Sequence, residues 1–139
     1  MSDEIAVPSI GLDAFGIQNA RVATSLDLTK MENRKVILRC LQDCDKRLTE
    51  EVGEQLKVTD YFIHDVECRN EKTGEVTTAP RLVLIDKGNK THECVSETLV
   101  GSLKNICFVY GKPPWPDGIT LTPKMKRKGE RNIYFFEVK

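Results

Sequence analysis

The sequence predicts a mainly β protein: a five-stranded OB-type barrel with one capping α-helix between its third and fourth strands, preceded by an N-terminal arm. Three observations predict it. Three strand-like runs come first, one capped amphipathic helix follows, and a basic strand-turn-strand ends the chain. An OB barrel has this order of elements and binds oligonucleotides or oligosaccharides on its strand face and loops.

The composition indicates a single globular domain without an overall charge bias. The chain has 139 residues, of which 40% are hydrophobic, and its 21 Lys and Arg balance its 21 Asp and Glu. A nucleic-acid partner would therefore have to meet a local patch of cations, because phosphate affinity depends on where positive charges cluster. No apolar run approaches the roughly twenty residues that span a bilayer. The acidic start is also unlike a signal peptide, so no membrane contact is expected.

The five cysteines indicate a reducing compartment. They are odd in number and irregular in spacing: Cys40, Cys44, Cys68, Cys94 and Cys107. Secreted disulfide frameworks more often have an even set. We therefore expect reduced thiols in a cytoplasmic protein.

The first part of the chain divides into an arm and the start of the domain. Residues 1–30 have few apolar residues with any period, which predicts a flexible arm, and the domain is expected to cover residues 31–139. The run Arg34–Leu41 predicts a strand, with Val36 and Leu38 on one face. The stretch Asp43–Gly53 predicts a short helix or turn.

The next three elements are predicted strands. Leu56–Arg69 alternates most clearly, and Asp60 interrupts the alternation, which predicts a bulge that lets a small sheet bend. A turn at residues 70–75 leads into the second strand, Val76–Asp86. The tight turn Lys87–Asn89 leads into the third, Lys90–Val95.

The remaining elements are one helix and two strands. Ser96 is a suitable N-cap, apolar residues then recur at helical spacing as far as Tyr110, and Gly111 ends the helix. The fourth strand begins near Ile119. The fifth, Asn132–Val138, follows a turn at residues 128–130.

The basic C-terminal strand-turn-strand is the main candidate for function. Five cations lie within eight residues, and aromatic residues follow them directly: Lys124, Lys126, Arg127, Lys128 and Arg131, then Tyr134, Phe135 and Phe136. Proteins that bind single strands need cations that follow the phosphates and rings on which bases stack. The alternative interpretation is a solvated hairpin tip without a partner, which is the usual role of a charge run.

Further candidates lie on or beside the second and third strands. We expect nucleic-acid contacts from Arg81, Lys87, Lys90 and His92. An ion pair of Arg81 with Asp65 or Glu67 is equally compatible with the sequence. Tyr61 and Phe135 point away from the apolar faces of their predicted strands and are candidate stacking platforms. Contact with the arm or with the second chain of a homodimer is the alternative for these two rings.

Metal-binding and catalytic patterns are not evident. Cysteines and histidines are present, but paired CxxC motifs are not, and most cysteines fall on predicted apolar faces. His64 lies on the inward face of its predicted strand and is interpreted as a core residue. GxSxG, phosphate-loop and HExxH motifs are missing. We therefore expect no metal, no cofactor and no enzymatic activity.

Several segments together resemble a known family. They are Asp45–Gly53 before the long strand, Asn70–Val76 at the following turn, Ala79–Asp86, Val95-Ser96 before the helix, and Gly111–Trp115 after it. This set is similar to small bacteriophage proteins described as single-stranded DNA-binding proteins. The resemblance covers Met31–Val138, and its motifs are structural rather than catalytic.

The resemblance implies an OB-type domain that coats single strands during phage DNA replication or recombination, in the host cytoplasm. Replication or recombination proteins would then be further partners. By position, it places Arg81 and the residues from Lys126 to Arg131 near the strand-binding face. The function predicted from the sequence is thus binding of single-stranded DNA with little sequence preference. The alternative is a protein-interaction module, either a replisome adaptor or a protein that captures a host factor.

Overall fold

Seven β-strands and two α-helices make up residues 22–139, the part of the chain that the computed structural model describes. The strands are β1 (Val22–Thr24), β2 (Lys46–Arg47), β3 (Leu56–Arg69), β4 (Val76–Asp86), β5 (Thr91–Val95), β6 (Ile119–Lys128) and β7 (Arg131–Val138). The helices are α1 (Met31–Gln42) and α2 (Glu97–Tyr110), and a 3-10 turn covers Leu48–Glu50. The mainly β prediction is confirmed, with more strands than the five expected.

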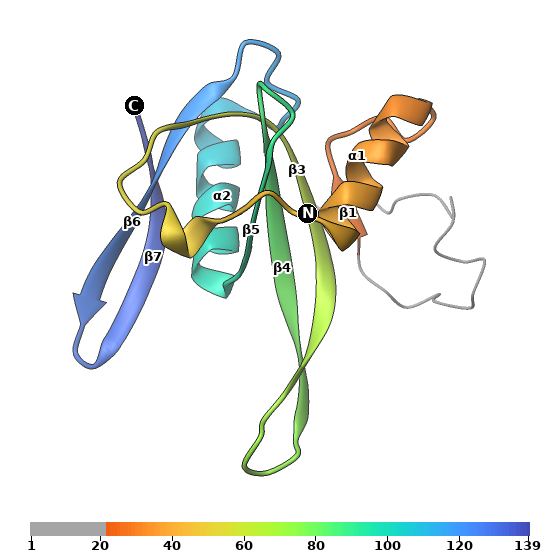
Figure 1. Ribbon diagram of the computed structural model, residues 1–139. Helices are drawn as coiled ribbons and strands as arrows, with labels where there is room; N and C mark the ends of the chain where they lie inside the picture. Colours follow the sequence, from red (N-terminus) through yellow and green to blue (C-terminus); the bar gives the residue numbers. More distant parts are fainter. Residues whose placement is uncertain (1–21) are drawn as a thin grey trace.

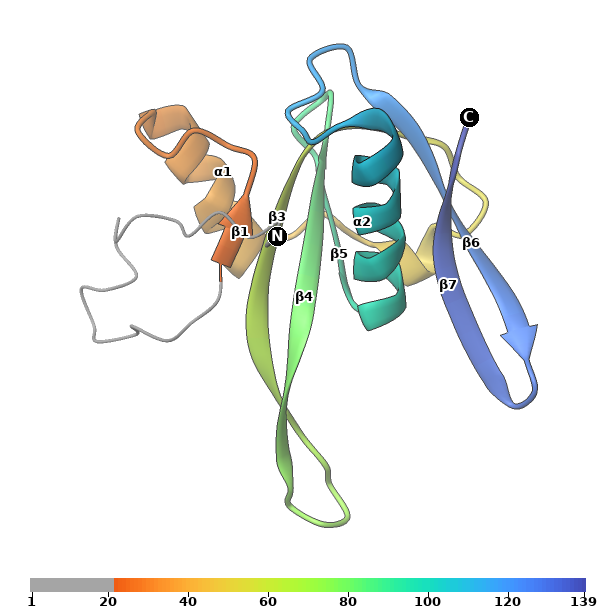
Figure 2. The same cartoon turned by 180° about the vertical axis from the view of Figure 1, so that it is seen from behind.

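The strands form one curled sheet in the order β2-β5-β4-β3-β6-β7, and β1 pairs with β3 beside this path. Strand β3 connects the two halves, because it pairs with β4 along most of its length and with β6 only at Leu56–Val58. The β3–β4 and β6–β7 hairpins consequently diverge, and α2 lies between them (Figure 1). Figure 2 shows the same arrangement from behind.

The main core lies between the inner face of the sheet and α2. Leu82 and Leu84 of β4 pack there with Leu99 and Leu103 of α2, and all four are buried. Ser96 begins the helix as predicted, since its hydroxyl accepts the backbone N–H of Leu99 at 3.2 Å. We call this side of the sheet the inner face.

A second core lies on the opposite side, the outer face, beneath α1 (Figure 1). Cys40 of α1 is fully buried against Val83 and Ile85 of β4, and Val36 and Ile37 pack around it. The predicted strand at Arg34–Leu41 is therefore wrong. Its β-branched residues favour a strand locally, but the three- to four-residue spacing of Val36, Ile37 and Cys40 gives a helix one apolar stripe that covers the outer face.

Part of the predicted arm belongs to the folded body. Val22, Ala23 and Thr24 form β1, all three are buried, and they pair antiparallel with Phe62–His64 of β3. The Thr24 hydroxyl also donates to the backbone carbonyl of Tyr61 at 2.7 Å. A flexible arm reaching residue 30 is thus incorrect for residues 22–24, and residues 1–21 lie outside the described part of the chain.

The predicted bulge in the long strand is present, and it reverses the faces that follow it. The register of β3 with β4 shifts between Val58 and Asp60. One extra residue moves every later side chain to the opposite face. Tyr61 therefore joins the inner core with Val58, whereas Phe62 and His64 lie on the outer face. The expected inward direction of His64 is wrong for this reason.

The other elements follow the predicted order closely. Strands β3 to β7 and helix α2 occupy the predicted segments, and Asp43–Gly53 contains β2 and the 3-10 turn. Trp115 is buried after α2, where its indole N–H donates to the carbonyl of Gly111 at 3.1 Å. Neither helix within residues 22–139 is long and apolar enough to cross a membrane.

Candidate nucleic-acid interface

The β6–β7 hairpin places half of the predicted contact residues on one face. Residues directly opposite each other in an antiparallel pair have side chains on the same side. Here Lys124 lies opposite Phe135, Lys126 opposite Ile133 and Lys128 opposite Arg131. We call this side the basic face; its residues are Lys124, Lys126, Lys128, Arg131, Ile133 and Phe135.

Local sequence explains why this hairpin forms. Lys128 and Arg131 are the last pair, so Gly129 and Glu130 make a two-residue loop. Gly129 has φ 66°, and glycine is the residue that tolerates such a value at the first loop position. Pro123 removes no hydrogen bond between β6 and β7, because the backbone groups of this pair point away from each other. The carbonyl of Pro123 accepts the N–H of Gly53 at 2.8 Å, and the N–H of its partner Phe136 donates to Ser102 of α2 at 2.8 Å.

The basic face is open to solvent and positively charged. Lys126, Lys128 and Arg131 are exposed, Lys124 is half-buried, and Glu130 is the one carboxylate among residues 124–131. The Lys126 ammonium lies 5.7 Å from the centroid of the Phe135 ring, within the range of a cation–π contact. A cation and a partly exposed ring are thus adjacent on this face.

An open groove of about 720 Å³ runs beside the basic face, between α2 and β7. One stripe of the helix lines it together with residues of the hairpin: Thr98, Gly101, Ser102, Asn105, Ile106, Val109 and Tyr110 from α2, and Lys126, Ile133, Tyr134, Phe135 and Phe136 from the hairpin. This α2–β7 groove has no carboxylate in its lining, and Lys126 is its single charged residue. Its chemistry therefore suits an anionic ligand with flat rings.

Arg81 does not belong to this surface. It lies on the outer face beneath α1, and its side chain is largely buried. Its guanidinium contacts Glu93 at 3.2 Å, the Nε2 of His64 at 3.0 Å and the Sγ of Cys44 at 3.3 Å. Arg81 therefore forms a structural ion pair, which was the alternative interpretation of the sequence. Its acidic partner is Glu93 rather than Asp65 or Glu67.

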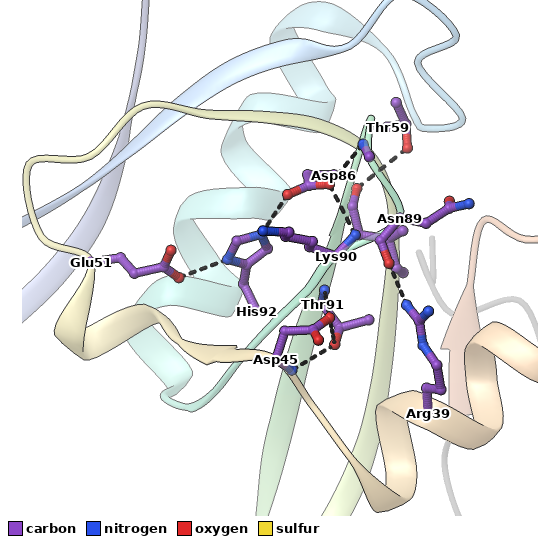
Figure 3. A network of polar contacts seen from close by, with 11 residues as sticks. Arg39, Asp45, Glu51, Thr59, Asp86, Asn89, Lys90, Thr91 and His92 are labelled. Carbon is purple, nitrogen blue, oxygen red and sulfur yellow. Dashed lines mark hydrogen bonds and ion pairs between the residues drawn. The ribbon is translucent and has the colours of Figure 1, made fainter.

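His92 is buried within a polar network (Figure 3). Its Nδ1 lies 2.7 Å from a carboxylate oxygen of Glu51, and its Nε2 lies 2.9 Å from Asp86. Next to it, Asp45 accepts the backbone N–H and hydroxyl of Thr91 at 2.9 and 3.1 Å, which lowers the pKa of Asp45. The network ties the 3-10 turn and β2 to β5, so the prediction that His92 contacts nucleic acid is wrong.

The remaining predicted contacts are also separate from the hairpin. Tyr61 is buried in the inner core and offers no stacking surface. Lys87 and Lys90 are exposed, but the N–H of Lys87 donates to the carbonyl of Lys57, beside the start of β6. The basic loop lies at the far end of this strand, roughly 30 Å away at about 3.3 Å per residue. The ten predicted contacts therefore do not form one surface.

Helix α1 explains why the predicted contact residues are separated. It covers the outer face of β3 and β4, where the nucleic-acid-binding strand face was predicted. Sequence reasoning missed the groove for a related reason. Tyr110 was assigned to the apolar stripe of its helix, yet 57% of it is exposed. The signal available was that Tyr110 and Tyr134 are aromatic residues on the two elements that flank the basic run.

Other possible sites within residues 22–139 are less developed. A second cavity of about 120 Å³ lies between β1, β3 and α2 and is mostly apolar, with Ala23, Ile63 and Leu103 in its lining. His, Cys, Asp and Glu side chains form no cluster of three or more that could hold a metal ion in this part of the chain. Burial raises the pKa of the Cys40 and Cys94 thiols to about 12, which leaves both poorly reactive.

Comparisons of this chain with protein-family models, with curated proteins and with solved structures found no match. The geometry of the hairpin and the groove is therefore the basis for a functional proposal.

Proposed function

We propose that this protein binds single-stranded DNA, with little sequence preference, through the basic face of its β6–β7 hairpin. The observation that carries the proposal is the shared face: four cations and the Phe135 ring lie on one side of one hairpin, on a chain with no net charge. Phosphates would contact Lys124, Lys126, Lys128 and Arg131. Single-strand binding without base readout needs this combination of cations and ring faces.

The fold supports the same proposal. The elements from β3 to β7 follow one another in the order expected of an OB barrel, and the pairing of β3 with both β4 and β6 supports this interpretation. We propose an OB-type domain that is open on one side, since β5 pairs with β2 at its outer edge and not with β7 within the described residues. Replication or recombination of phage DNA in the host cytoplasm is the role that we propose for it.

The proposal predicts a defined salt dependence. Each phosphate contact on a single strand contributes about −0.7 to the slope of log K against log salt. Four cations would give a slope near −3, which corresponds to roughly a 50-fold loss of affinity between 50 and 200 mM salt. A labelled oligo-dT titrated at these two concentrations measures it directly.

A charge-reversal variant and a matched control test the position of the site. Replacing Lys126, Lys128 and Arg131 by Glu should abolish binding and leave the thermal midpoint nearly unchanged, because all three are exposed. The control variant replaces three exposed cations elsewhere by Glu: Lys35, Lys87 and Lys90. It changes the net charge equally and should bind nearly as well as the native protein. Equal affinities of the two variants, or binding that ignores salt, would contradict the proposal.

One observation favours a protein partner as the second candidate function. The Phe108 ring near the end of α2 is 91% exposed, which is unusual for a large apolar side chain without a partner. A protein-interaction module would use such a ring, and it would show no salt-dependent binding of oligo-dT. The same titration therefore separates the two functions.

A further inference from the structure

We infer that the α2–β7 groove holds the bases of the bound strand, with the ring of Tyr110 as a stacking platform. This inference rests on the proposed function and extends it to the groove that adjoins the basic face. The basic face would hold the phosphates, and the groove beside it would hold the bases. Lys126, Ile133 and Phe135 belong to both surfaces, so the two surfaces are continuous and one strand can place its backbone on one and its bases on the other.

The dimensions of the groove fit a short single strand. The helical stripe from Thr98 to Tyr110 spans about 18 Å at 1.5 Å per residue. A stacked strand advances about 3.4 Å per nucleotide, so this length holds up to about five nucleotides. Sites of single OB folds cover roughly 4 to 16 nucleotides. The groove is open to solvent, so it can admit part of a continuous strand and not only one free nucleotide.

The lining offers what bases need and little that would select among them. Tyr110 and Tyr134 come from opposite walls, and both have a ring that is not fully buried. The exposed side-chain amide of Asn105 lies on the same helical stripe, before Tyr110 in sequence, and an amide can both donate to and accept from a base edge. Stacking tolerates any base, so this lining predicts weak sequence preference.

Charge favours nucleic acid over a peptide in this groove. β7 is the last strand of the sheet path, and an extended peptide could pair with such an edge. However, Ser102 of α2 already accepts the outward N–H of Phe136, which occupies part of that edge. The cations of the basic face and the lack of carboxylates in the lining both match a polyanion that carries rings.

Two oligonucleotides of equal charge test the inference on the native protein. One is oligo-dT and the other is an abasic deoxyribose-phosphate oligomer of the same length. Phosphate contacts alone would bind both equally. Stacking contributes roughly 5- to 150-fold in affinity per base. The native protein should therefore bind oligo-dT at least about 5-fold more tightly than the abasic oligomer.

Variants of the exposed ring then locate the platform. Tyr110→Ala should lose about 5-fold or more in affinity for oligo-dT with an unchanged salt slope, and Tyr110→Phe should restore it. Phe108→Ala is the matched control, since this ring is more exposed, lies two residues away and does not line the groove. It should leave the affinity unchanged.

Equal affinity for the two oligonucleotides, with salt dependence retained, would overturn the inference and leave the phosphate contacts of the proposed function intact. An effect of Phe108→Ala as large as that of Tyr110→Ala would overturn the assignment of the groove. Absence of salt-dependent binding altogether would overturn both proposals, and the groove would then be tested as a peptide site.

Discussion

The guanidinium of Arg81 donates to the Nε2 of His64 at 3.0 Å on the outer face of the sheet. Arginine keeps its protons at any ordinary pH, so this nitrogen of His64 must accept and the neutral ring carries its proton on Nδ1. The ring also stacks on Phe62, with centroids 5.0 Å apart. Burial, and then the charge of Arg81, lowers the pKa of His64 below its usual 6.5.

This pair predicts a loss of stability in mild acid. The unfolded chain takes up the proton of His64 near pH 6.5, whereas the folded protein resists protonation until lower pH. The contribution of His64 to stability is therefore complete above about pH 7 and declines as the pH falls below 6.5. Thermal unfolding of the native protein and of His64→Gln between pH 7.5 and 5.5 measures it. Glutamine still accepts from Arg81 but does not titrate, so its midpoint should fall less; parallel curves would contradict the prediction.

The buried thiols predict a graded reaction with alkylating reagents. Cys40 and Cys94 are buried, and desolvation raises the pKa of each to about 12, so neither forms much thiolate near pH 8. Mass spectrometry after brief iodoacetamide treatment should find both unmodified in the folded protein. Both should react fully in denaturant, which serves as the control. Rapid labelling of Cys40 in the folded state would mean that α1 does not stay on the outer face.

The His92 network predicts a large effect on stability and none on DNA binding. His92→Ala leaves the buried carboxylate of Glu51 without its partner, which should cost about 2–5 kcal/mol of unfolding free energy. Chemical denaturation measures this loss. Adding Glu51→Gln removes the unpaired charge and should recover part of it. Reduced affinity for oligo-dT in a folded His92 variant would contradict this prediction and would indicate that His92 does contact the DNA.

Local sequence signals were sufficient to predict most of the fold. Each of these signals depends only on residues that are close together in the sequence: the alternation over Leu56–Arg69, the Ser96 cap and the glycine of the last loop. The common face of the hairpin cations was predictable for the same reason. The two-residue loop fixes which residues of β6 and β7 lie opposite each other, and this register decides on which face each side chain lies. These features needed no knowledge of distant contacts.

The errors arose where distant segments decide the outcome. The bulge before Asp60 was expected, but its effect on the direction of Tyr61 depends on which residue of β4 lies opposite. Arg81 could be recognised as a charge on an apolar strand, yet its partner Glu93 comes from another strand. The segment that contains Cys40 is a helix because it packs on the outer face of the sheet, and the sequence of that segment alone does not show that such a face is available.

Both strands of the β6–β7 hairpin have open edges within residues 22–139, because β7 ends the sheet path and β6 pairs with β3 only at Ile119–Leu121. This gives the lysines of β6 a second consequence. Open strand edges tend to pair with one another and aggregate, and proteins commonly keep them apart with charges, lysine above all. Lys126 and Lys128 would thus keep copies of the protein apart as well as attract phosphate. Replacing them by alanine would mix lost affinity with lost solubility, whereas glutamate preserves the repulsion between copies.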